Sequence, residues 1–371
     1  MAAKLVDELI TEGAIKLKKG KIFDVALQPF PDSFNYDEYV EGMLLCVAIG
    51  DALGYPTESH LPNSRWETHG GDIVAYNSGR QRDKKKEEAI GGPSDDTQMT
   101  YWTLAQMIED KGCLNFENIA KCFLQSKIFG IGQAVREATS KLRYDTHWTQ
   151  SGAKSAGNGS LMRMAPVILP NLKVGGSQIW SDVVLLGLMT HNDPVSMASC
   201  IAFVYMAWQA LSMESPPPPN WYLETFLKVA EDLEPQDSSY KPRGGKWTSY
   251  SGTLCGYVKL VIAEACKQNW DTRQACNNWF SGAYLLETVP CVLYILMKHG
   301  SDLKTAIIRS VNDTKDNDTV AAIVGMVLGA LHGKSKIPEL WINNLSGRTL
   351  KADNGKVFSL LEAAKQIYWK K

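Results

Sequence analysis

Apolar residues recur along most of the chain with the spacing of α-helices, three or four positions apart on one face. The clearest stripe covers residues 320–331, and in the same segment Gly325, Gly329 and Gly333 follow one another every four residues. Glycines at that spacing favour close packing of one helix against another. The alternation of apolar and polar residues that marks β-strands is weak throughout. The pattern therefore predicts an all-α fold, one compact domain of many helices with its functional residues on loops at helix starts.

Two regions depart from this pattern. Residues 1–35 contain a predicted amphipathic helix followed by a segment that ends in prolines, and we interpret them as an N-terminal arm appended to a domain of residues 36–371. The apolar face of the predicted helix is formed by Val6, Leu9, Ile10, Ala14 and Leu17. The arm is either an extension that binds a partner or a terminal helix that docks on its own core. The second region, residues 214–252, is expected to be a Pro-rich loop with no evident chemistry.

Composition narrows the classes of function. The 371 residues carry a formal net charge of −1 and the sequence pI is about 6.6, so we expect no basic surface for nucleic acid or for an anionic membrane. No stretch of about eighteen apolar residues is evident, and the N-terminal segment is of mixed charge rather than apolar. We expect a monomeric, cytoplasmic protein without a membrane span.

The most informative polar feature is a pair of short acidic clusters, one at residues 94–97 and the other at residues 316–319, each leading directly into a helical segment. Taken singly, either cluster is explained as a helix cap, because Ser, Thr and Asp are the preferred N-cap residues. Two aspartates so close together exceed what one cap requires, and they repel each other unless a cation or a strong donor is near. If the fold joins the two helix starts, their carboxylates and hydroxyls form an all-oxygen site suited to a hard divalent cation.

Several glycine-containing loops are candidates for ligand binding. Residues 157–160, Gly-Asn-Gly-Ser, carry exposed amides that could approach a phosphate closely. This loop matches neither the dinucleotide-binding fingerprint nor the P-loop, and an ordinary loop is the plain alternative. Each of the other candidates also has a structural alternative as a cap, a packing residue or a surface carboxylate. They are residues 50–54, Glu58, residues 130–132, residues 190–194 around His191, and residues 282–284 with Tyr284.

Five of these segments follow one another in the order typical of the ADP-ribosylglycohydrolase family, and the chain resembles that family from about residue 36 to residue 333. The motifs are Gly50-Asp51-Ala52-Leu53-Gly54, Ser94-Asp95-Asp96-Thr97, Gly157-Asn158-Gly159-Ser160-Leu161-Met162-Arg163, Thr190-His191-Asn192-Asp193-Pro194 and Asp316-Asn317-Asp318-Thr319. Two positions depart from the family pattern. Ser94 stands where Thr is usual, which keeps the hydroxyl, and Lys315 stands where a glycine-rich entry is usual. The Lys315 ammonium either points to solvent or biases the affinity for metal.

The resemblance implies an orthogonal bundle of helices around a binuclear magnesium site, with Mn²⁺ as a substitute metal. The metal ligands that it implies are Ser94, Asp95, Asp96, Asp316, Asp318 and Thr319, with Asp318 as the bridging ligand. The catalytic carboxylates that it implies are Glu58, Asp95, Asp96 and Asp318. The substrate contacts that it implies are Gly132, Gly157, Asn158, Gly159, Ser160, Met162, His191 and Tyr284. Which carboxylate serves as the general base is left open.

The activity that the resemblance implies is magnesium-dependent hydrolysis of the N-glycosidic bond between ADP-ribose and a protein side chain. Arginine is favoured as the acceptor over serine or a small molecule, and the partner is then a mono-ADP-ribosylated protein. Two alternatives stay open. One is an immunity protein that occludes an ADP-ribosyltransferase toxin through residues 1–35, and the other is a structural descendant that has lost catalysis. The complete ligand set argues against the second alternative.

Overall fold

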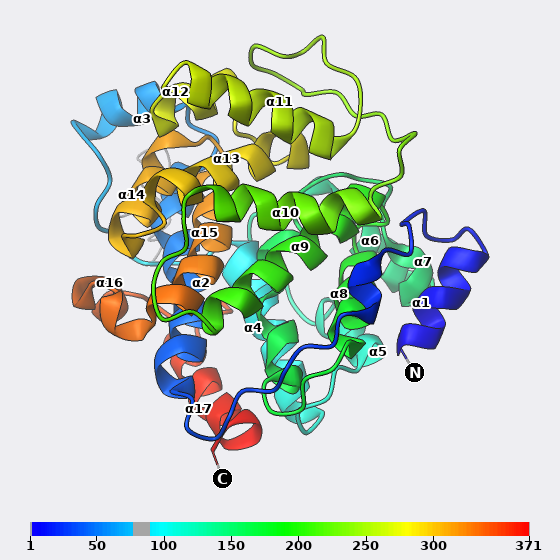
Figure 1. Cartoon of the computed structure of the whole chain (residues 1–371). Helices are drawn as coiled ribbons and strands as arrows, with labels where there is room; N and C mark the ends of the chain where they lie inside the picture. The colour runs from blue at the N-terminus through cyan, green and yellow to red at the C-terminus, as the bar shows by residue number, and fades with distance from the viewer. Residues whose placement is uncertain (1, 77–89, 371) are drawn as a thin grey trace.

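The computed structural model describes residues 2–76 and 90–370, and within these ranges the regular structure is helical (Figure 1). Pairing between extended segments is limited there to isolated bridges, without a sheet. The all-α prediction is therefore confirmed. In chain order the α-helices are α1 (Ala2–Thr11), α2 (Tyr36–Gly54), α3 (Pro62–His69), α4 (Asp95–Glu109), α5 (Phe116–Cys122), α6 (Gln133–Arg143), α7 (Trp148–Ser151), α8 (Gln178–Leu188), α9 (Pro194–Leu211), α10 (Asn220–Leu233), α11 (Leu254–Lys267), α12 (Thr272–Asn278), α13 (Leu285–His299), α14 (Leu303–Asp313), α15 (Asn317–His332), α16 (Glu339–Asn343) and α17 (Lys356–Tyr368).

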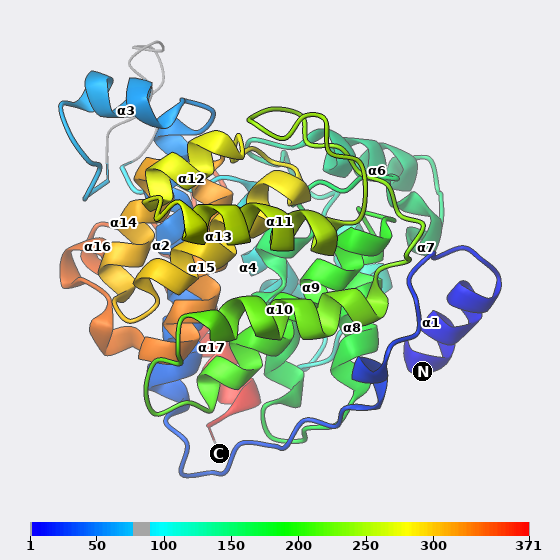
Figure 2. The same ribbon diagram turned by 45° about the horizontal axis from the view of Figure 1, so that its top comes forward.

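Two helices, α2 and α15, pack side by side through the core (Figures 1 and 2). Every residue from 40 to 54 of α2 and from 317 to 331 of α15 is buried. A helix that is buried on all sides has no solvent face to tolerate charge, so any acidic residue within it needs a specific partner. Both helices carry such residues at the ends that meet, which is where the candidate site lies.

Glycines bring α2 and α15 closer together than side chains would allow. A Cβ atom placed on Gly329 would lie 2.3 Å from the carbonyl oxygen of Gly42, and one placed on Gly54 would lie 2.5 Å from the Cα of Asp318. Such contacts are too short for a real methyl group. The Gly54 contact joins the end of α2 to the start of α15, and the Gly42 contact joins the first half of α2 to the last turn of α15. The two helices therefore run antiparallel. The close packing predicted from the glycine spacing is confirmed.

Helix α9 is long and apolar enough to cross a membrane by length and composition, with a mean hydropathy of 1.3, and is the one such helix in the described part of the chain. The expectation that no apolar stretch of this length occurs is therefore wrong. Serines and a glutamine interrupt the run without removing its apolar character. The segment is 83% buried within the molecule and packs against α8, α10 and α15, as a core helix does.

The N-terminal arm docks on the helical core. Helix α1 packs against α8, with Val6 and Leu9 buried. The helix is shorter than the predicted stripe, because Gly13 adopts a left-handed conformation with φ of +72°, which ends helices. Ala14 is consequently exposed, whereas Leu17 is buried outside the helix.

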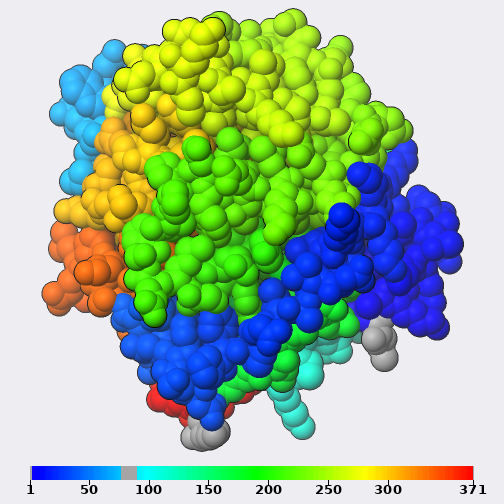
Figure 3. All heavy atoms as spheres, viewed as in Figure 1, coloured from blue at the N-terminus to red at the C-terminus, as the bar shows by residue number. Residues whose placement is uncertain are grey.

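Beyond α1 the arm crosses the surface to α2 and includes a short 3-10 helix at Lys21–Asp24 (Figures 2 and 3). The amide of Lys18 donates to the carbonyl oxygen of Leu233 at 2.9 Å, and the indole of Trp180 donates to that of Val25 at 2.8 Å. Further contacts of this kind attach the arm to the rest of the molecule. The division at residue 35 and the binding of a partner by the arm stay predictions.

The Pro-rich region 214–252 contains α10 and then a polar loop that hydrogen bonds attach to the core at several points. The Tyr240 hydroxyl donates to the carboxylate of Asp193, the N-cap residue of α9, at 3.1 and 3.2 Å. The guanidinium of Arg243 donates to the buried carboxylate of Glu287 in α13, with Nη2 2.8 Å from Oε2. The loop is therefore folded onto the core rather than left as an unattached spacer.

We expect Gly329→Ala to lower the free energy of unfolding by about 2 kcal/mol or more, because the added methyl forces α2 and α15 apart. The matched control is Gly187→Ala in α8, where the nearest atoms to the added methyl lie 4.0 Å away. That change should be neutral or stabilise the protein by up to about 1 kcal/mol. Urea denaturation followed by circular dichroism measures both variants, and equal free energies of unfolding would contradict the packing account.

Candidate active site

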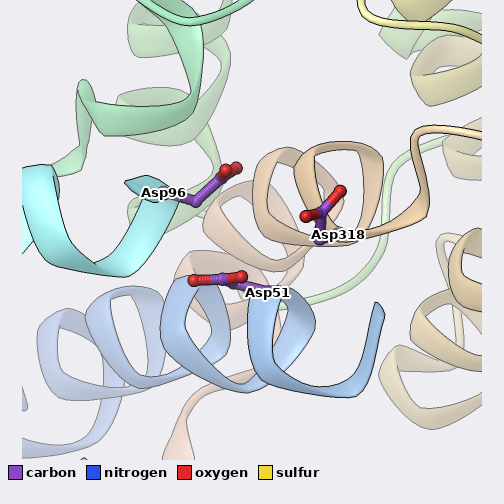
Figure 4. A group of neighbouring side chains, drawn as sticks. All are labelled: Asp51, Asp96 and Asp318. Carbon is purple, nitrogen blue, oxygen red and sulfur yellow. The ribbon is translucent and has the colours of Figure 1, made fainter. Parts of the chain in front are cut away.

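The starts of α4 and α15 meet the last turns of α2 inside the molecule. Each of the three helices contributes a buried aspartate there: Asp51 from α2, Asp96 from α4 and Asp318 from α15. One carboxylate oxygen of each lies within 4.8 Å of those of the other two. Figure 4 shows the three side chains gathered around a common space. The two acidic clusters, more than two hundred residues apart in the sequence, thus lie side by side.

A cleft with a cavity of about 220 Å³ opens over this cluster. Glu58, Asp316 and Asp318 line it and form a second acidic group, again with one oxygen of each within 4.8 Å of the others. Asp318 belongs to both groups, so it links the part of the cluster next to α2 with the part next to Glu58. Asp95, Asp96 and Thr319 line the same cleft.

Hydrogen bonds hold the first turn of α4 in place. The Ser94 hydroxyl accepts from the amide of Asp96 at 3.1 Å and donates to its Oδ2 at 3.0 Å. The Thr319 hydroxyl donates to the same Oδ2 at 3.4 Å. By contrast, Oδ1 of Asp96 is buried and has no hydrogen-bond partner among the described residues. An unsatisfied buried acceptor costs about 1–3 kcal/mol, and more when it is charged, so this oxygen is suited to receive a cation or a donor from a ligand.

Asp51 fixes the start of α4 from the neighbouring helix. Its carboxylate accepts from the amide of Ser94 at 3.0 Å and from the amide and hydroxyl of Thr97 at 2.9 and 2.5 Å. These bonds satisfy amides at a helix start, which otherwise lack partners within the helix. Asp51 belongs to one of the motifs in the sequence, but the motif predicted no role for it. The available indication was an acidic residue within the apolar run of residues 42–54, a position that acidic residues rarely occupy unless paired.

The start of α15 is arranged differently. Asp316 occupies the N-cap position, yet its side chain makes no capping bond. Its Oδ2 instead accepts from Nδ2 of Asn158 at 2.5 Å. Asp318 accepts from the amide of Thr319 at 2.9 Å. The Ser94 side chain therefore caps its helix, as the plain alternative predicted. The Asp316 side chain makes no capping bond and lines the cleft instead.

Burial raises the pKa of the carboxyl groups in the cluster, and repulsion from neighbouring carboxylates adds to the effect. The pKa of Asp95 is raised to about 8 and that of Asp316 to about 7. The pKa values of Asp96 and Asp318 are raised well above their ordinary value by the same two causes. Near neutral pH the cluster on its own therefore retains protons, and a cation that binds there displaces them.

The cluster fits a hard divalent cation by the chemistry of its donors. All of its side-chain ligands are carboxylate or hydroxyl oxygens, which Mg²⁺ and Mn²⁺ prefer. The unpartnered Oδ1 of Asp96 and the raised pKa values both indicate that the carboxyl groups lack a counter-charge that would favour their ionised form. The acidic residues can therefore bind metal, as the resemblance implied.

Backbone pairing places the glycine loop between two other segments of the cleft. Gly157 pairs with Tyr284 in an antiparallel bridge, and Ala153 pairs with His191 in a parallel bridge. The His191 ring packs against the loop, because a Cβ on Gly159 would lie only 3.1 Å from its Cε1. Side chains larger than hydrogen at these loop positions would therefore collide with the ring or fill the cleft.

The cleft gathers most of the residues predicted to contact substrate. They are Gly132, Gly157, Asn158, Gly159, Met162, His191 and Tyr284. Ser160 is the exception, because it does not line the cleft, and its contact with substrate stays a prediction. Its side chain is fully buried, and its hydroxyl lies 2.6 Å from that of Ser196 and 3.5 Å from the sulfur of Cys200. The chain turns after Gly159, so the Ser160 side chain faces α9 in the core rather than the cleft.

Two cationic side chains lie near the site, and one of them, Arg243, was not anticipated from the sequence. Arg243 is the only Lys or Arg that lines the cleft among the described residues, and its guanidinium lies 5.0 Å from the ring centre of Tyr284. Nothing in the surrounding polar stretch distinguishes it before the loop is folded onto the core. The Lys315 ammonium, whose direction the sequence left open, lies over the ring of Phe280 at 4.0 Å.

Comparison with known proteins bears on the family and the fold. The family model described as ADP-ribosylglycohydrolase matches residues 33–367. A solved structure titled "ADP-ribosylglycohydrolase-related protein complex" has the same fold, with a TM-score of 0.64 over 90% of this chain and 98% of that chain at 20% sequence identity. The predicted fold type is thereby confirmed.

Curated relatives align along most of the chain. The ADP-ribosyl-[dinitrogen reductase] glycohydrolase of Rhodospirillum rubrum is 24% identical over 87% of this chain and 95% of its own length. The ADP-ribosylarginine hydrolase Tri1 of Pseudomonas putida is 26% identical over 82% of this chain and 74% of its own length. The human ADP-ribosylhydrolase ARH3 is 26% identical over 53% of this chain and 56% of its own length. These matches confirm the resemblance inferred from the motifs.

The raised pKa values predict that, in a metal chelator, the protein becomes more stable as the pH falls from about 8.5 to about 6. The pKa values of Asp95 and Asp316, about 8 and about 7, exceed those of unfolded carboxyls. The folded state therefore binds more protons than the unfolded state in this window, and acidification favours folding.

Melting temperatures recorded in EDTA across this pH range measure the effect. Asp95→Asn should flatten the pH dependence, whereas Asp237→Asn, at an exposed position outside the cleft, should leave it unchanged. A melting temperature that falls on acidification over this window, or an Asp95→Asn profile identical to that of the wild type, would contradict the electrostatic account.

Proposed function

Because this chain belongs to the ADP-ribosylglycohydrolase family, we propose that it hydrolyses the N-glycosidic bond between ADP-ribose and an arginine side chain of a protein, with Mg²⁺ as cofactor. Hydrolysis of ADP-ribose linkages is the activity of the family. Arginine as the acceptor is supported by the relative named ADP-ribosylarginine hydrolase. The substrate partner is then a mono-ADP-ribosylated protein.

The observation that carries the proposal is the gathering of carboxylates beside a glycine loop in one cleft. Asp95, Asp96 and Asp318 line one part, and the backbone of residues 157–159 lines another. Glycosidic cleavage develops positive charge at the sugar, which nearby carboxylates stabilise. The amides of a glycine loop suit a negatively charged diphosphate. The two parts of the cleft thus match the two charged parts of an ADP-ribosyl group.

The cofactor proposal rests on the donor set of the cluster. The residues that would hold two Mg²⁺ ions, or Mn²⁺ in their place, are Ser94, Asp95, Asp96, Asp316, Asp318 and Thr319. When bound, such ions lower the pKa of water and orient substrate hydroxyls. Asp51 keeps the first turn of α4 in register through its bonds to Ser94 and Thr97. Asn158 holds the carboxylate of Asp316 by donating to it.

Proton transfer falls to the carboxylates that face the cleft. Glu58 and Asp316 lie together in one acidic group. Glu58 is outside the set proposed to hold the metal and lines the cleft, so we assign it the proton of the attacking water. Because these carboxyl groups interact closely, the pKa values seen in a pH profile belong to the group as a whole and not to one residue.

The arm does not favour toxin occlusion as a second function. Val6 and Leu9 form the apolar face of α1, and both are buried against the core of the same chain. A partner could use that face only after α1 had detached. Binding of an ADP-ribosyltransferase toxin through residues 1–35 therefore stays a prediction from sequence.

Release of ADP-ribose from an arginine-ADP-ribosylated protein tests the proposal. We expect release with Mg²⁺, none in EDTA, and a rate at least about 100-fold lower for Asp96→Asn, because the variant loses a carboxylate of the proposed metal site that lines the cleft. Asp237→Asn, which removes a surface carboxylate, serves as the matched control and should retain the full rate. Circular dichroism establishes that each variant is folded.

A parallel assay with a serine-ADP-ribosylated protein tests the acceptor. Release from serine but not from arginine would overturn the proposed acceptor while leaving the hydrolase in place. Release from neither substrate by folded protein supplied with Mg²⁺ or Mn²⁺ would overturn the proposed hydrolase.

A further inference from the structure

We propose that Arg163 and Thr190 hold His191 in one neutral tautomer, so that its Nε2–H is a fixed hydrogen-bond donor to an oxygen atom of the substrate. His191 lines the cleft, whereas Arg163 and Thr190 are fully buried and contact no solvent. The identity of the substrate rests on the proposed function, but the tautomer itself does not. Arg163 and Thr190 are thereby assigned as positioning residues that act through His191.

Two hydrogen bonds connect the three side chains. Nη2 of Arg163 donates to Oγ1 of Thr190 at 2.8 Å, and Oγ1 of Thr190 lies 2.9 Å from Nδ1 of His191. An arginine side chain has donors and no acceptor, so the direction of the first bond is fixed. The threonine oxygen is therefore the acceptor from Arg163 and still carries one proton of its own. Thr190 donates that proton to Nδ1 of His191.

The opposite tautomer leaves a donor unused. If Nδ1 carried the proton, both Arg163 and His191 would donate to the Thr190 oxygen, and the threonine O–H would lose its acceptor in a fully buried position. A buried donor without a partner is strongly disfavoured, which corresponds to roughly a tenfold preference or more for the tautomer that satisfies it. The proton of the ring therefore resides on Nε2.

The same surroundings keep the ring neutral. Burial lowers the pKa of His191 to about 3, and the positive charge of Arg163 acts in the same direction. Arg163 stays charged at neutral pH, because burial lowers its pKa only to about 10. Nδ1 therefore remains an acceptor, and the threonine bond keeps its direction.

The protonated nitrogen faces the part of the cleft next to the glycine loop. Nε2 lies 3.3 Å from the position that a Cβ on Gly157 would occupy and 3.4 Å from that on Gly159. With hydrogen at both loop positions, a ligand oxygen has room to approach the N–H. A phosphate oxygen or a sugar hydroxyl fits this donor, and ADP-ribose carries both.

Histidine-selective ¹⁵N labelling of the full-length protein tests the tautomer without reference to activity. The chain has six histidines, and the signals that disappear in His191→Gln assign the ring. Long-range ¹H–¹⁵N correlation spectra should show Nε2 protonated and Nδ1 bare between about pH 6 and about pH 8. A protonated Nδ1, or a doubly protonated ring in that range, would overturn the inference even if the protein is an active hydrolase.

Thr190→Val removes the hydroxyl and keeps the shape of the side chain. We expect it to abolish the single tautomer and to weaken the affinity for ADP-ribose, measured by calorimetry with Mg²⁺ present, by roughly threefold to tenfold. Thr190→Ser retains the hydroxyl and should retain both properties. An unchanged tautomer and unchanged affinity in Thr190→Val would overturn the positioning role. If the wild type fails to bind ADP-ribose, the proposed function fails, while the spectra still decide the tautomer.

The ligand oxygen is identified by repeating the titration with ADP, which lacks the distal ribose. A loss of affinity for both ligands in Thr190→Val assigns the donor to the diphosphate, and a loss for ADP-ribose alone assigns it to the distal ribose. His191→Gln, whose amide reaches the position of Nε2, should bind ADP-ribose more tightly than His191→Asn. Equal affinities of these two variants would overturn the donor role of Nε2.

Discussion

The contact between α2 and α15 sets the geometry of the whole site. Gly54 lies against the backbone of Asp318, and Gly50, one turn earlier, lies against that of Ala321. Asp51 follows directly after Gly50, so this contact brings its carboxylate next to Asp318 and lets it bond the first turn of α4. A larger residue at either glycine would move α2 away from α15, and the acidic turn of α4 would move with it. Backbone packing thus determines where the carboxylates lie.

That arrangement concentrates acidic groups where burial penalises their charge. The pKa of Asp95 and that of Asp318 are both raised by burial and by neighbouring carboxylates. The apolar surface that α2 and α15 bury on all sides offsets this cost. A bound divalent cation would relieve the repulsion, which couples metal affinity to the stability of the folded state. Beside this acidic cluster lies the glycine loop, against which the neutral His191 ring packs.

Local sequence patterns were sufficient to predict the helices and to identify the acidic clusters and the glycine loops. Helical spacing, cap residues and glycine spacing are all properties of short segments. Several features that depend on contacts between distant segments were missed, although the meeting of the two acidic clusters was anticipated. Asp51 acquires its role only when α2 meets α4, and Arg243 reaches the cleft only because its loop is fixed to Asp193 and Glu287. Ser160 was assigned to the cleft by its motif alone, although the turn after the glycine loop directs its side chain to α9.

The most direct test of the account is Mn²⁺ binding by the wild type and by Asp318→Asn, measured by electron paramagnetic resonance and calorimetry. Asp318 belongs to both acidic groups, so we predict that the wild type binds two Mn²⁺ ions that are magnetically coupled. Asp318→Asn should lose at least one ion and the coupling. Absence of saturable binding at millimolar Mn²⁺, or identical binding by the folded Asp318→Asn variant, would contradict the claim that packing of α2 on α15 builds a divalent metal site.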